Sequence, residues 1–592
     1  ADSLLVAYAM ALSLQDSNGR YEWDLTVLRD TLGPRAVDFF APLIGPDDSA
    51  LDGSTAPLGE PPSPRAINLR IDSEIVAQST KPDPSSADEF AAAGSNAFGV
   101  PGLHSASGSA LLAGDPHLDL AVPNTWYRAA LEWTDASSSP VRVEGLTLPG
   151  VPAVLIGSNG HLAWTFTNSY ADTGDLVEIE LDRTAPEIFY LRGSDLVEFE
   201  KHRDTITVKG GDPVVVDSTW TLWGPLVAQS TIGRTYAYKW TLDDPAALDL
   251  ELVRLGGTKD FDAALAILQH AGMPPQNVLL ASRDGRLTWT MAGRLPQRFG
   301  FDGRLPSKWT FGDRGWSGFL PASATPRRDA PPAKFLWSAN QRMVGGEALT
   351  KIGDGGYMSS LRAGRIAERL TDDLQKNQPL HPADLLAVQL DTHASWLEPW
   401  REILRTTLEN APEMQQADWQ AFRDAVMNSD LNATIDANGY RLLRTWVSAV
   451  TRRTLDPIFE RCRQKSPGWS WQRFNVNPAV YSLHHDGRQM HLLAPEYSDW
   501  RALRLVAVQD VLDAIDDDGL SPATATWGKR NRARIRHPFS SLLPIALGPL
   551  LDLPADPLPG DQNVPRVQSP SFGASARMVV SPGHEDEGIL HV

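Results

Sequence analysis

The chain has one cysteine, Cys462, in 592 residues. A single cysteine can form neither an internal disulfide nor a thiolate zinc site, so neither feature holds this protein together. Basic residues are also in the minority, since 54 Lys and Arg stand against 73 Asp and Glu and leave a formal net charge of −19. A field of that sign repels phosphate backbones and anionic lipid, which argues against nucleic acid and membrane surfaces as partners.

Long apolar runs and several common catalytic motifs are missing as well. No segment approaches the roughly 20 apolar residues that a membrane-spanning helix needs. The sequence has no G-x-S-x-G, H-E-x-x-H, phosphate loop or G-x-G-x-x-G ahead of a helix, which excludes the usual hydrolase, zinc-protease and nucleotide signatures. The densest histidine group, His484, His485 and His491, lacks carboxylates at metal-ligand spacing and favours a structural or surface role.

The first part of the chain changes character several times. Residues 1–45 have an apolar helical pattern, and the stretch from 46 to 64 is rich in Pro, Gly, Ser and Asp, which indicates loop. Residues 66–77 have the composition of a strand. The following polar stretch, 78–94, is typical of an exposed linker whose removal a fold tolerates.

The remainder divides into a β-rich part and a helical part. Alternating or wholly apolar runs predict strands from Ser95 to about Asn340, with hairpin turns at Asn159-Gly160 and Asp284-Gly285. Helical periodicity predicts helices over about 359–463. Together these patterns indicate an α+β chain.

One position offers a catalytic nucleophile. Ser95 stands where the linker ends at Gly94 and a strand-like apolar run begins. A serine hydroxyl needs a base close by, and cleavage of the Gly94–Ser95 bond would give Ser95 its own base as a free α-amine, whose ordinary pKa is about 7.7–8.0. Because glycine lacks a Cβ, Gly94 can take the strained conformation that exposes its carbonyl to the Ser95 oxygen.

The motifs around and beyond Ser95 resemble the penicillin acylase (penicillin amidase) family of N-terminal-nucleophile hydrolases, which mature from one precursor by autocatalytic cleavage. The resemblance runs in order along almost the whole chain, through SASGSALLAGDPHLDL, VLIGSNGHLAWTFTNSYADTGDLVEIEL, TWTLWGPLV, NVLLASRDG, FLWSANQR, SSLRAGRIAERL, TWGKRNRARIRHPF and SFGASARMVV. It implies a four-layer αββα sandwich with a helical insertion in the β chain.

The resemblance also implies catalytic roles. Ser95 matches the family's N-terminal nucleophile, which would also act as base through its α-amine. His117, in GDPH, would form hydrogen bonds near Ser95 and help to orient it. Asn340, in SANQR, matches the asparagine whose side-chain amide donates to the tetrahedral oxyanion. One such donor is typically worth about 3–4 kcal/mol of transition-state stabilisation.

Two further positions complete the implied catalytic set. The second oxyanion donor of the family is a backbone N–H shortly after the motif W-x-x-T, here Trp164 to Thr167, which places it at Asn168. A shift of one residue would give Ser169 instead. Arg365, in AGRIAERL, matches an arginine that supports the asparagine and the entrance of the active site, although its pattern also suits the surface of an amphipathic helix.

The resemblance further implies one structural calcium ion. Its ligands would be Asp172 and Asp175 in ADTGD, Asp354, and Glu22 from the segment before the linker. Carboxylate oxygens from distant segments suit calcium, which accepts 6–8 oxygens in flexible geometry. The ion would join the two chains of the processed protein and take no part in the chemistry.

The expected domain organisation follows from the predicted cleavage. Residues 1–77 would form the C-terminal part of an α chain, residues 78–94 a spacer that is removed, and residues 95–592 the β chain with the helical segment at about 359–463. The two chains would form a heterodimer. Family members usually have additional residues before the position of Ala1 and after that of Val592, so we expect both ends of the full α and β chains to be missing.

The expected activity is hydrolysis of linear N-acyl amides, such as the side-chain amides of β-lactams, through an acyl-enzyme on Ser95. The acyl group would lie in an apolar pocket formed partly by residues 11–15 and by Phe166. An acyl-homoserine-lactone or lipopeptide acylase with a long-chain pocket is an alternative, and so is an inactive fragment or scaffold. Calcium, a self-cleaving linker and the near-absence of cysteine suit a bacterial periplasmic or secreted protein.

Overall fold

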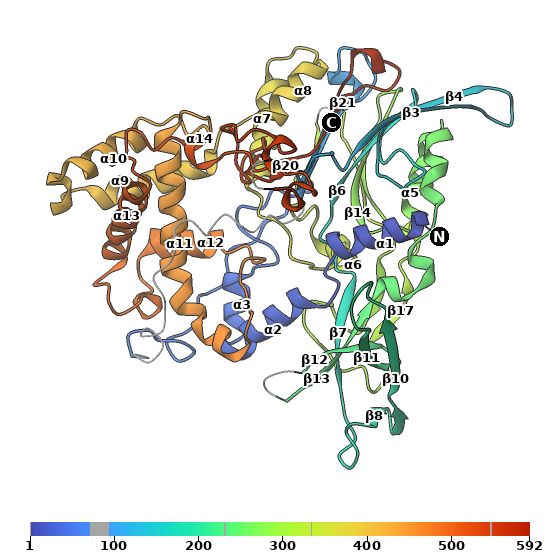
Figure 1. Cartoon of the computed structure of the whole chain (residues 1–592), viewed down its shortest axis with the longest axis horizontal. Coiled ribbons are helices and arrows are strands. Elements are labelled where there is room, and N and C mark those ends of the chain that lie inside the picture. The colour runs from blue at the N-terminus through green and yellow to red at the C-terminus, as the bar shows by residue number, and fades with distance from the viewer. Residues whose placement is uncertain (1, 72–93, 230–232, 333, 545–546) are drawn as a thin grey trace.

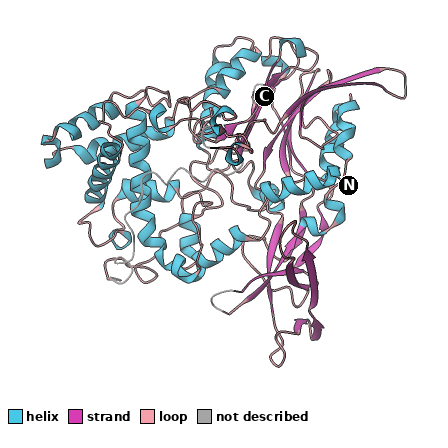
Figure 2. Ribbon diagram, in the orientation of Figure 1, coloured by secondary structure: helices cyan, strands magenta, loops and turns pink. Residues whose placement is uncertain are grey.

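The computed structural model describes residues 2–71, 94–229, 233–332, 334–544 and 547–592. It combines a β-rich body with a helical body (Figures 1 and 2). The strand predicted at 66–77 and the linker predicted at 78–94 lie largely outside the described residues. The part of that strand that is described, 66–71, forms turns instead.

The sheet that carries Ser95 has six strands. Its strands run in the order β19-β1-β2-β21-β22, and a further strand, β20, also pairs with β2. Every pairing is antiparallel, and all seven residues of β1 are buried. The strands are β1 (Gly94–Val100), β2 (Leu111–Asp119), β19 (Leu336–Ser338), β20 (Phe572–Ala574), β21 (Arg577–Val580) and β22 (Ile589–His591).

A seven-stranded antiparallel sheet packs against the first one. Its order is β18-β15-β14-β6-β5-β4-β3. Asn159-Gly160 turns the chain from β5 into β6, and Asp284-Gly285 turns it from β14 into β15, so both predicted hairpins are confirmed. The strands are β3 (Tyr127–Thr134), β4 (Pro140–Thr147), β5 (Ile156–Ser158), β6 (Leu162–Asn168), β14 (Gln276–Ser282), β15 (Leu287–Ala292) and β18 (Arg327–Asp329).

The alternation of side chains along β1 explains how this sheet is covered on both faces. Ala97 joins a buried cluster shared with the seven-stranded sheet, whereas Phe98 joins a cluster formed with two helices, α7 (Leu361–Gln375) and α8 (Pro382–Gln389). Successive residues of a strand point to opposite faces, so a strand that is covered on both sides is buried throughout. A further helix, α5 (Phe261–His270), packs against the seven-stranded sheet through another buried cluster.

Three smaller sheets extend the β-rich body. A five-stranded sheet in the order β10-β11-β12-β13-β7 forms the projection at the bottom of Figure 1, and two hairpins, β8-β9 and β16-β17, complete it. The strands are β7 (Gly174–Ile179), β8 (Phe189–Arg192), β9 (Asp195–Glu198), β10 (Glu200–Ile206), β11 (Val214–Thr221), β12 (Gly224–Gln229), β13 (Thr235–Trp240), β16 (Pro296–Phe299) and β17 (Gly315–Phe319).

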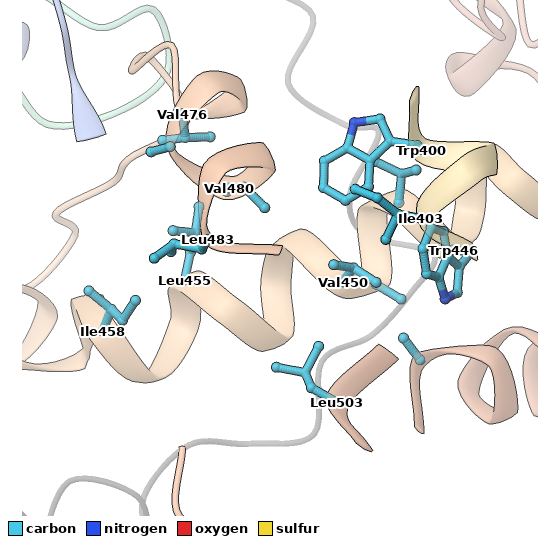
Figure 3. Close-up of a cluster of buried hydrophobic side chains, with 14 of the residues drawn as sticks. Trp400, Ile403, Trp446, Val450, Leu455, Ile458, Val476, Val480, Leu483 and Leu503 are labelled. Carbon is cyan, nitrogen blue, oxygen red and sulfur yellow. The ribbon is translucent and has the colours of Figure 1, made fainter. Parts of the chain in front are cut away.

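The helical body joins the beginning of the chain to its later part. Helices α2 and α3 share one apolar core with helices α9 to α13, part of which is drawn in Figure 3. The helices before the linker are α1 (Asp2–Leu14), α2 (Arg20–Leu32) and α3 (Pro34–Phe40). Those after the linker are α6 (Gly346–Ile352), α9 (Glu398–Leu408), α10 (Ala417–Met427), α11 (Asn438–Lys465), α12 (Asn477–Asp486), α13 (Trp500–Asp517) and α14 (Trp527–Arg530).

The helical segment is longer than the sequence indicated. It continues past Arg463 to the end of α13 at Asp517. The buried residues of α13 include Leu503, Ala507 and Val511, which are four apart and therefore form one stripe against the core. Within the described part of the chain, no helix has both the length and the apolarity that crossing a membrane requires.

Candidate active site

The start of β1 places Ser95 near one end of a buried strand. Gly94 pairs with His117 of β2, and Ser95 pairs with Pro116. Only 7% of Ser95 is exposed, and its hydroxyl donates a hydrogen bond to the carbonyl oxygen of Gly94. The hydroxyl therefore lies against the carbonyl group of the peptide bond that is predicted to be cleaved.

Asn340 faces Ser95 from the residues that follow β19. Its Oδ1 accepts hydrogen bonds from the Ser95 backbone N–H at 2.7 Å and from Arg362 Nη2 at 2.9 Å. Since both partners can only donate, they fix which end of the amide is oxygen. The Nδ2 group donates one hydrogen bond to the carbonyl oxygen of Asn168 at 2.9 Å. Its second N–H is the one that would donate to an oxyanion.

The backbone at Asn340 is held in the left-handed region, with a φ of 70°. Asparagine tolerates this region better than most residues with a Cβ. Asn340 lies just past the end of β19, and this backbone conformation lets its side chain reach back to Ser95 in β1. Asn340 is fully buried, so its three hydrogen bonds leave it little freedom.

Asn168 and Ser169, the two candidates for the backbone donor, differ in their surroundings. Asn168 ends β6, its side chain donates to the carbonyl oxygen of Leu14 at 3.1 Å, and it lines the same cavity as Ser95. Ser169 instead donates its hydroxyl to the carbonyl oxygen of Pro275 at 2.7 Å. The cavity shared with Ser95 therefore favours Asn168, whose role as oxyanion donor stays a prediction.

The arginine beside Asn340 is Arg362, which corrects the assignment of Arg365. Arg362 donates to Ser95 O at 3.2 Å and to Asn96 Oδ1 at 2.6 Å as well as to Asn340. Burial lowers the pKa of Arg362 to about 10, so it remains a cation at neutral pH. Arg365 pairs with Asp391 at 2.8 Å and with Glu368 at 3.1 Å.

The helix geometry explains this difference. Each residue of an α-helix advances about 1.5 Å along the axis and rotates the side chain by about 100°. Three residues therefore separate Arg362 from Arg365 by about 4.5 Å and about 60°. The motif LRAGRIAER contains arginines at 362, 365 and 369, and their sequence alone does not show which of them contacts β1.

Separate substitutions of Arg362 and Arg365 by glutamine provide a matched test. We expect Arg362→Gln to lower kcat/KM by about 10- to 100-fold, because hydrogen bonds to charged groups contribute about 1.5–3 kcal/mol. We expect Arg365→Gln to change kcat/KM by less than about twofold, since its partners among the described residues are Asp391 and Glu368, and neither bonds to Ser95 or Asn340. Rates are to be expressed per chain that begins at Ser95. A larger loss for Arg365→Gln than for Arg362→Gln would return the supporting role to Arg365.

Behind Ser95, a buried polar network joins β1, β2 and the two covering helices. Asp115 Oδ2 accepts from Asn96 Nδ2 at 3.0 Å and lies 2.6 Å from His117 Nε2, and its Oδ1 accepts from Gln389 Nε2 at 3.1 Å. Arg362 closes the network through Asn96. Sequence reasoning missed Asp115, Asn96 and Gln389. The alternation in GDPH, which places Asp115 and His117 on one face of a strand, was the available signal.

His117 is neutral in this environment. Burial lowers its pKa to about 4, and Asp115 opposes that shift only in part. The proton therefore lies on Nε2, which donates to Asp115, and Nδ1 is an acceptor without a hydrogen-bond partner in the described residues. A Cβ built at Gly94 would lie 3.4 Å from this Nδ1. His117 thus faces Gly94, and its predicted role in orienting Ser95 stays a prediction.

The four residues predicted to bind calcium are buried in one region, and two arginines pair with three of them. Arg298 pairs with Asp172 at 2.8 Å and with Asp175 at 2.9 Å, and Arg304 pairs with Asp354 at 2.9 Å. Among the described residues, no group of three or more acidic, histidine or cysteine side chains is arranged to hold a metal ion. Among the described residues, the predicted ligand set therefore leaves Glu22 Oε1 and Asp172 Oδ2 as its oxygens without a hydrogen-bond partner.

The charges of Asp172 and Asp175 also act on Glu22. Burial, and after it the charges of Asp175 and Asp172, raise the pKa of Glu22 well above its ordinary value. Its Oε2 accepts from the backbone N–H of Leu176 at 2.7 Å, and its Oε1 has no hydrogen-bond partner in the described residues.

An apolar cavity opens beside Ser95. It holds about 1060 Å³ of empty space, including its opening to solvent. Helix α1 contributes a stripe at positions 3, 7, 10 and 14, which is one face of a helix. The predicted contributions of Phe166 and of the segment 11–15 are found, the latter through Leu14, whereas Ala11 and Gln15 themselves do not line the cavity. Apolar lining side chains include Met10, Leu14, Leu118, Trp126, Leu148, Val151, Leu155, Ile156, Phe166, Leu252, Val253 and Met273.

The chain is similar to known proteins along its whole length. Residues 1–592 match the family model described as penicillin amidase. The acyl-homoserine lactone acylase QuiP of Pseudomonas aeruginosa is 25% identical over 69% of this chain and 48% of its own length. The penicillin acylase 2 proenzyme of Pseudomonas sp. (strain SE83) is 26% identical over 84% of this chain and 63% of its own length. The chain thus spans about half to two thirds of these relatives.

A solved structure has the same fold. The thermostable penicillin G acylase from Alcaligenes faecalis superposes with a TM-score of 0.57 at 18% sequence identity, over 73% of this chain and 80% of that one. This likeness supports the mixed helix-and-sheet architecture described above.

Proposed function

This chain belongs to the penicillin amidase family, and on that premise we propose that it is an acylase that cleaves itself before Ser95 and then hydrolyses N-acyl amides with that serine. The observation that carries the proposal is the contact of the Ser95 hydroxyl with the Gly94 carbonyl, beside the amide of Asn340. The finer features of the family, including the αββα layers, the α/β heterodimer and a periplasmic or secreted location, are part of the same proposal.

Two observations support the layers and the heterodimer, and a third supports the location. Helices α7 and α8, the six-stranded sheet, the seven-stranded sheet and α5 pack on one another in that order, as the αββα layers require. Helices α2 and α3 share a core with the helical body, so cleavage would leave the two chains joined. A single buried cysteine suits an oxidising compartment, since it cannot mispair within the chain.

Processing comes first in the proposed mechanism. The Ser95 Oγ attacks the Gly94 carbonyl carbon, an Oγ–C bond forms, and the Gly94–Ser95 C–N bond breaks. The hydroxyl proton passes to the departing nitrogen, which becomes the α-amine of Ser95. Water then hydrolyses the ester, which releases Gly94 as a carboxylate and restores the hydroxyl.

Turnover repeats this chemistry on a substrate amide. The α-amine of Ser95, with an ordinary pKa of about 7.7–8.0, takes the hydroxyl proton as Oγ attacks the acyl carbon. The negative charge on the carbonyl oxygen is held by the second N–H of Asn340 and by the backbone N–H of Asn168. The proton then passes to the leaving amine as its C–N bond breaks, and water releases the acid from the acyl-enzyme.

Arg362 and the polar network act through Asn340 and Ser95. The guanidinium contacts the oxygen of the Asn340 amide, so the amide is held with its nitrogen toward the site of the oxyanion. It also contacts the carbonyl oxygen of Ser95. Such a preorganised donor needs no rearrangement during the reaction.

The cavity favours a long aliphatic acyl group. Pockets that bind small ligands are lined mostly by apolar side chains, with a few polar groups that fix the orientation of the ligand. The lining of this cavity is almost wholly apolar and includes Ser95. We therefore propose a long-chain acyl amide, such as the acyl-homoserine lactone that QuiP is named for, as the preferred substrate. Penicillin-type amides with an aromatic acyl group are the second candidate, supported by the second relative.

A panel of amides that share one amine tests the proposal. We expect kcat/KM to rise with acyl length from butanoyl to at least octanoyl and to exceed the value for phenylacetyl, because each added CH₂ buries apolar surface worth about 0.8 kcal/mol. Met10→Trp, which narrows the cavity from α1, should reduce the rate for long chains most. Leu5→Trp is the matched control, since Leu5 is 66% exposed on the same helix. A preference for phenylacetyl would favour the second candidate, and no hydrolysis by chains beginning at Ser95 would refute both.

A further inference from the structure

The buried carboxylates of Asp172 and Asp175, near Glu22, have a cation of their own, Arg298. The side chains of Arg298 and Asp175 are 5% and 1% exposed, and that of Asp172 is 8% exposed. Arg298 lies in β16, Asp175 in β7 and Asp172 in the loop before it, so the pairing joins two segments that are far apart in the sequence. An unpaired charge at this depth would be strongly disfavoured.

The guanidinium group contacts the same kinds of oxygen that a calcium ion would use. Its Nε donates to Asp175 Oδ2 at 2.9 Å and to Oδ1 at 3.2 Å, and both terminal nitrogens lie 3.2 Å from the Asp172 carbonyl oxygen. Its Nη2 also pairs with Asp172 Oδ1 at 2.8 Å. Calcium binds carboxylate and backbone carbonyl oxygens, so the guanidinium takes a ligand set of that chemistry.

Few oxygens remain for an added metal ion. Trp316 Nε1 donates to Asp175 Oδ2 at 2.5 Å, which leaves Glu22 Oε1 and Asp172 Oδ2 as the oxygens of this cluster without a hydrogen-bond partner in the described residues. Gly303 lies beside Asp172 Oδ2, and a Cβ at position 303 would come within 2.7 Å of this oxygen. Calcium needs about 6–8 oxygens at about 2.3–2.6 Å, which this remainder does not provide.

The fourth carboxylate of the predicted site has a separate cation. Asp354 accepts from Arg304 Nε at 2.9 Å and from the Tyr21 hydroxyl at 3.3 Å. Arg304 also donates to the carbonyl oxygen of Ala41. This second guanidinium therefore ties the segment before the linker, which contains α2 and α3, directly to the segment after it.

We propose that Arg298 occupies the place of the structural metal ion that the family resemblance implies, so that this chain is stabilised at Glu22, Asp172 and Asp175 by an internal guanidinium and binds no calcium there. Arg304 does the same for Asp354. Thermal stability and metal content are measured without substrate, so a failure of this proposal is distinguishable from a failure of the proposed acylase activity.

The test measures thermal unfolding and bound metal in the whole protein. After treatment with a chelator, the wild-type midpoint should move by less than about 1 °C when millimolar CaCl₂ is added, and the calcium content should stay far below one ion per chain. A retained stoichiometric calcium ion, or a rise of more than about 2 °C with CaCl₂, would overturn the proposal.

Variants extend the test to the guanidinium itself. Arg298→Met should lower the midpoint in metal-free buffer and recover part of the loss with CaCl₂, because the freed oxygens then resemble a metal site. Arg314→Met is the matched control, since Arg314 pairs at the surface with its neighbour Asp313. An unchanged midpoint for Arg298→Met, or a lowered one that CaCl₂ does not raise, contradicts the proposal. If Arg298→Met fails to fold, Arg298→Lys, which keeps the charge, replaces it and should show a smaller loss.

Discussion

Replacement of Ser95 by alanine is expected to abolish both processing and turnover. The variant lacks the oxygen that contacts the Gly94 carbonyl, so the precursor should remain one intact chain. Loss of a catalytic nucleophile lowers kcat by factors on the order of 10⁴ or more. Mass spectrometry of the purified protein measures processing, and N-terminal sequencing identifies the second chain, which should begin Ser-Asn-Ala-Phe in the wild type.

The control separates loss of the nucleophile from loss of the fold. Ser137→Ala alters an exposed serine in the turn between β3 and β4, and it should be processed and active like the wild type. Ser95→Ala should unfold at a similar temperature to the uncleaved wild type, because it removes one hydroxyl from a strand of unchanged pairing. Cleavage before residue 95 in Ser95→Ala, or amide hydrolysis by the intact chain, would refute the mechanism.

Replacement of Asn340 has the second largest expected effect. Asn340→Asp keeps the shape of the side chain and an oxygen toward Arg362 but removes the N–H donor, and Asn340→Gly removes the whole amide while tolerating the φ of 70°. We expect either change to lower kcat by about 100- to 1000-fold, as the loss of one oxyanion donor does elsewhere. KM should change little, because the interaction is made in the transition state.

In the proposed mechanism the same amide would hold the charge that develops on the Gly94 carbonyl, so we expect processing to slow in the same variants. Rates are therefore to be measured after prolonged maturation and expressed per Ser95 N-terminus. Asn377→Gly is the matched control, because Asn377 also has a positive φ, 52°, and lies in the exposed turn after α7. A loss of less than about tenfold in both Asn340 variants would remove this side chain from the oxyanion site.

Features that depend on short stretches of sequence were predicted well. The turns at Asn159-Gly160 and Asp284-Gly285 follow from two residues that accept positive φ between apolar runs. The position of Ser95 at the start of a strand follows from the sharp change of composition at Gly94. The mixed α and β organisation follows from the same local periodicities.

Features that depend on contacts between distant segments were not predicted from the sequence. The choice between Arg362 and Arg365 depends on which face of α7 is buried against the sheet, and Asp115 becomes important only through its pairing opposite Asn96. Arg298 reaches Asp172 and Asp175 through the pairing of β16 with β17 and the packing of both on β7, and no nearby motif indicates it. The stripe of α13 was overlooked, although its spacing was present in the sequence.

The shared core of α2 and α3 with the helical body affects how the mature protein loses its structure. Phe40 of α3 packs edge-on against Phe459 of α11, and Trp469 donates to the carbonyl oxygen of Asp24 at 2.9 Å. Before cleavage these groups belong to one chain, and refolding restores them at any dilution. After the proposed cleavage they would belong to two molecules, so refolding would become bimolecular and concentration-dependent. We then expect heat inactivation of the cleaved protein to be governed by the rate of unfolding rather than by an equilibrium.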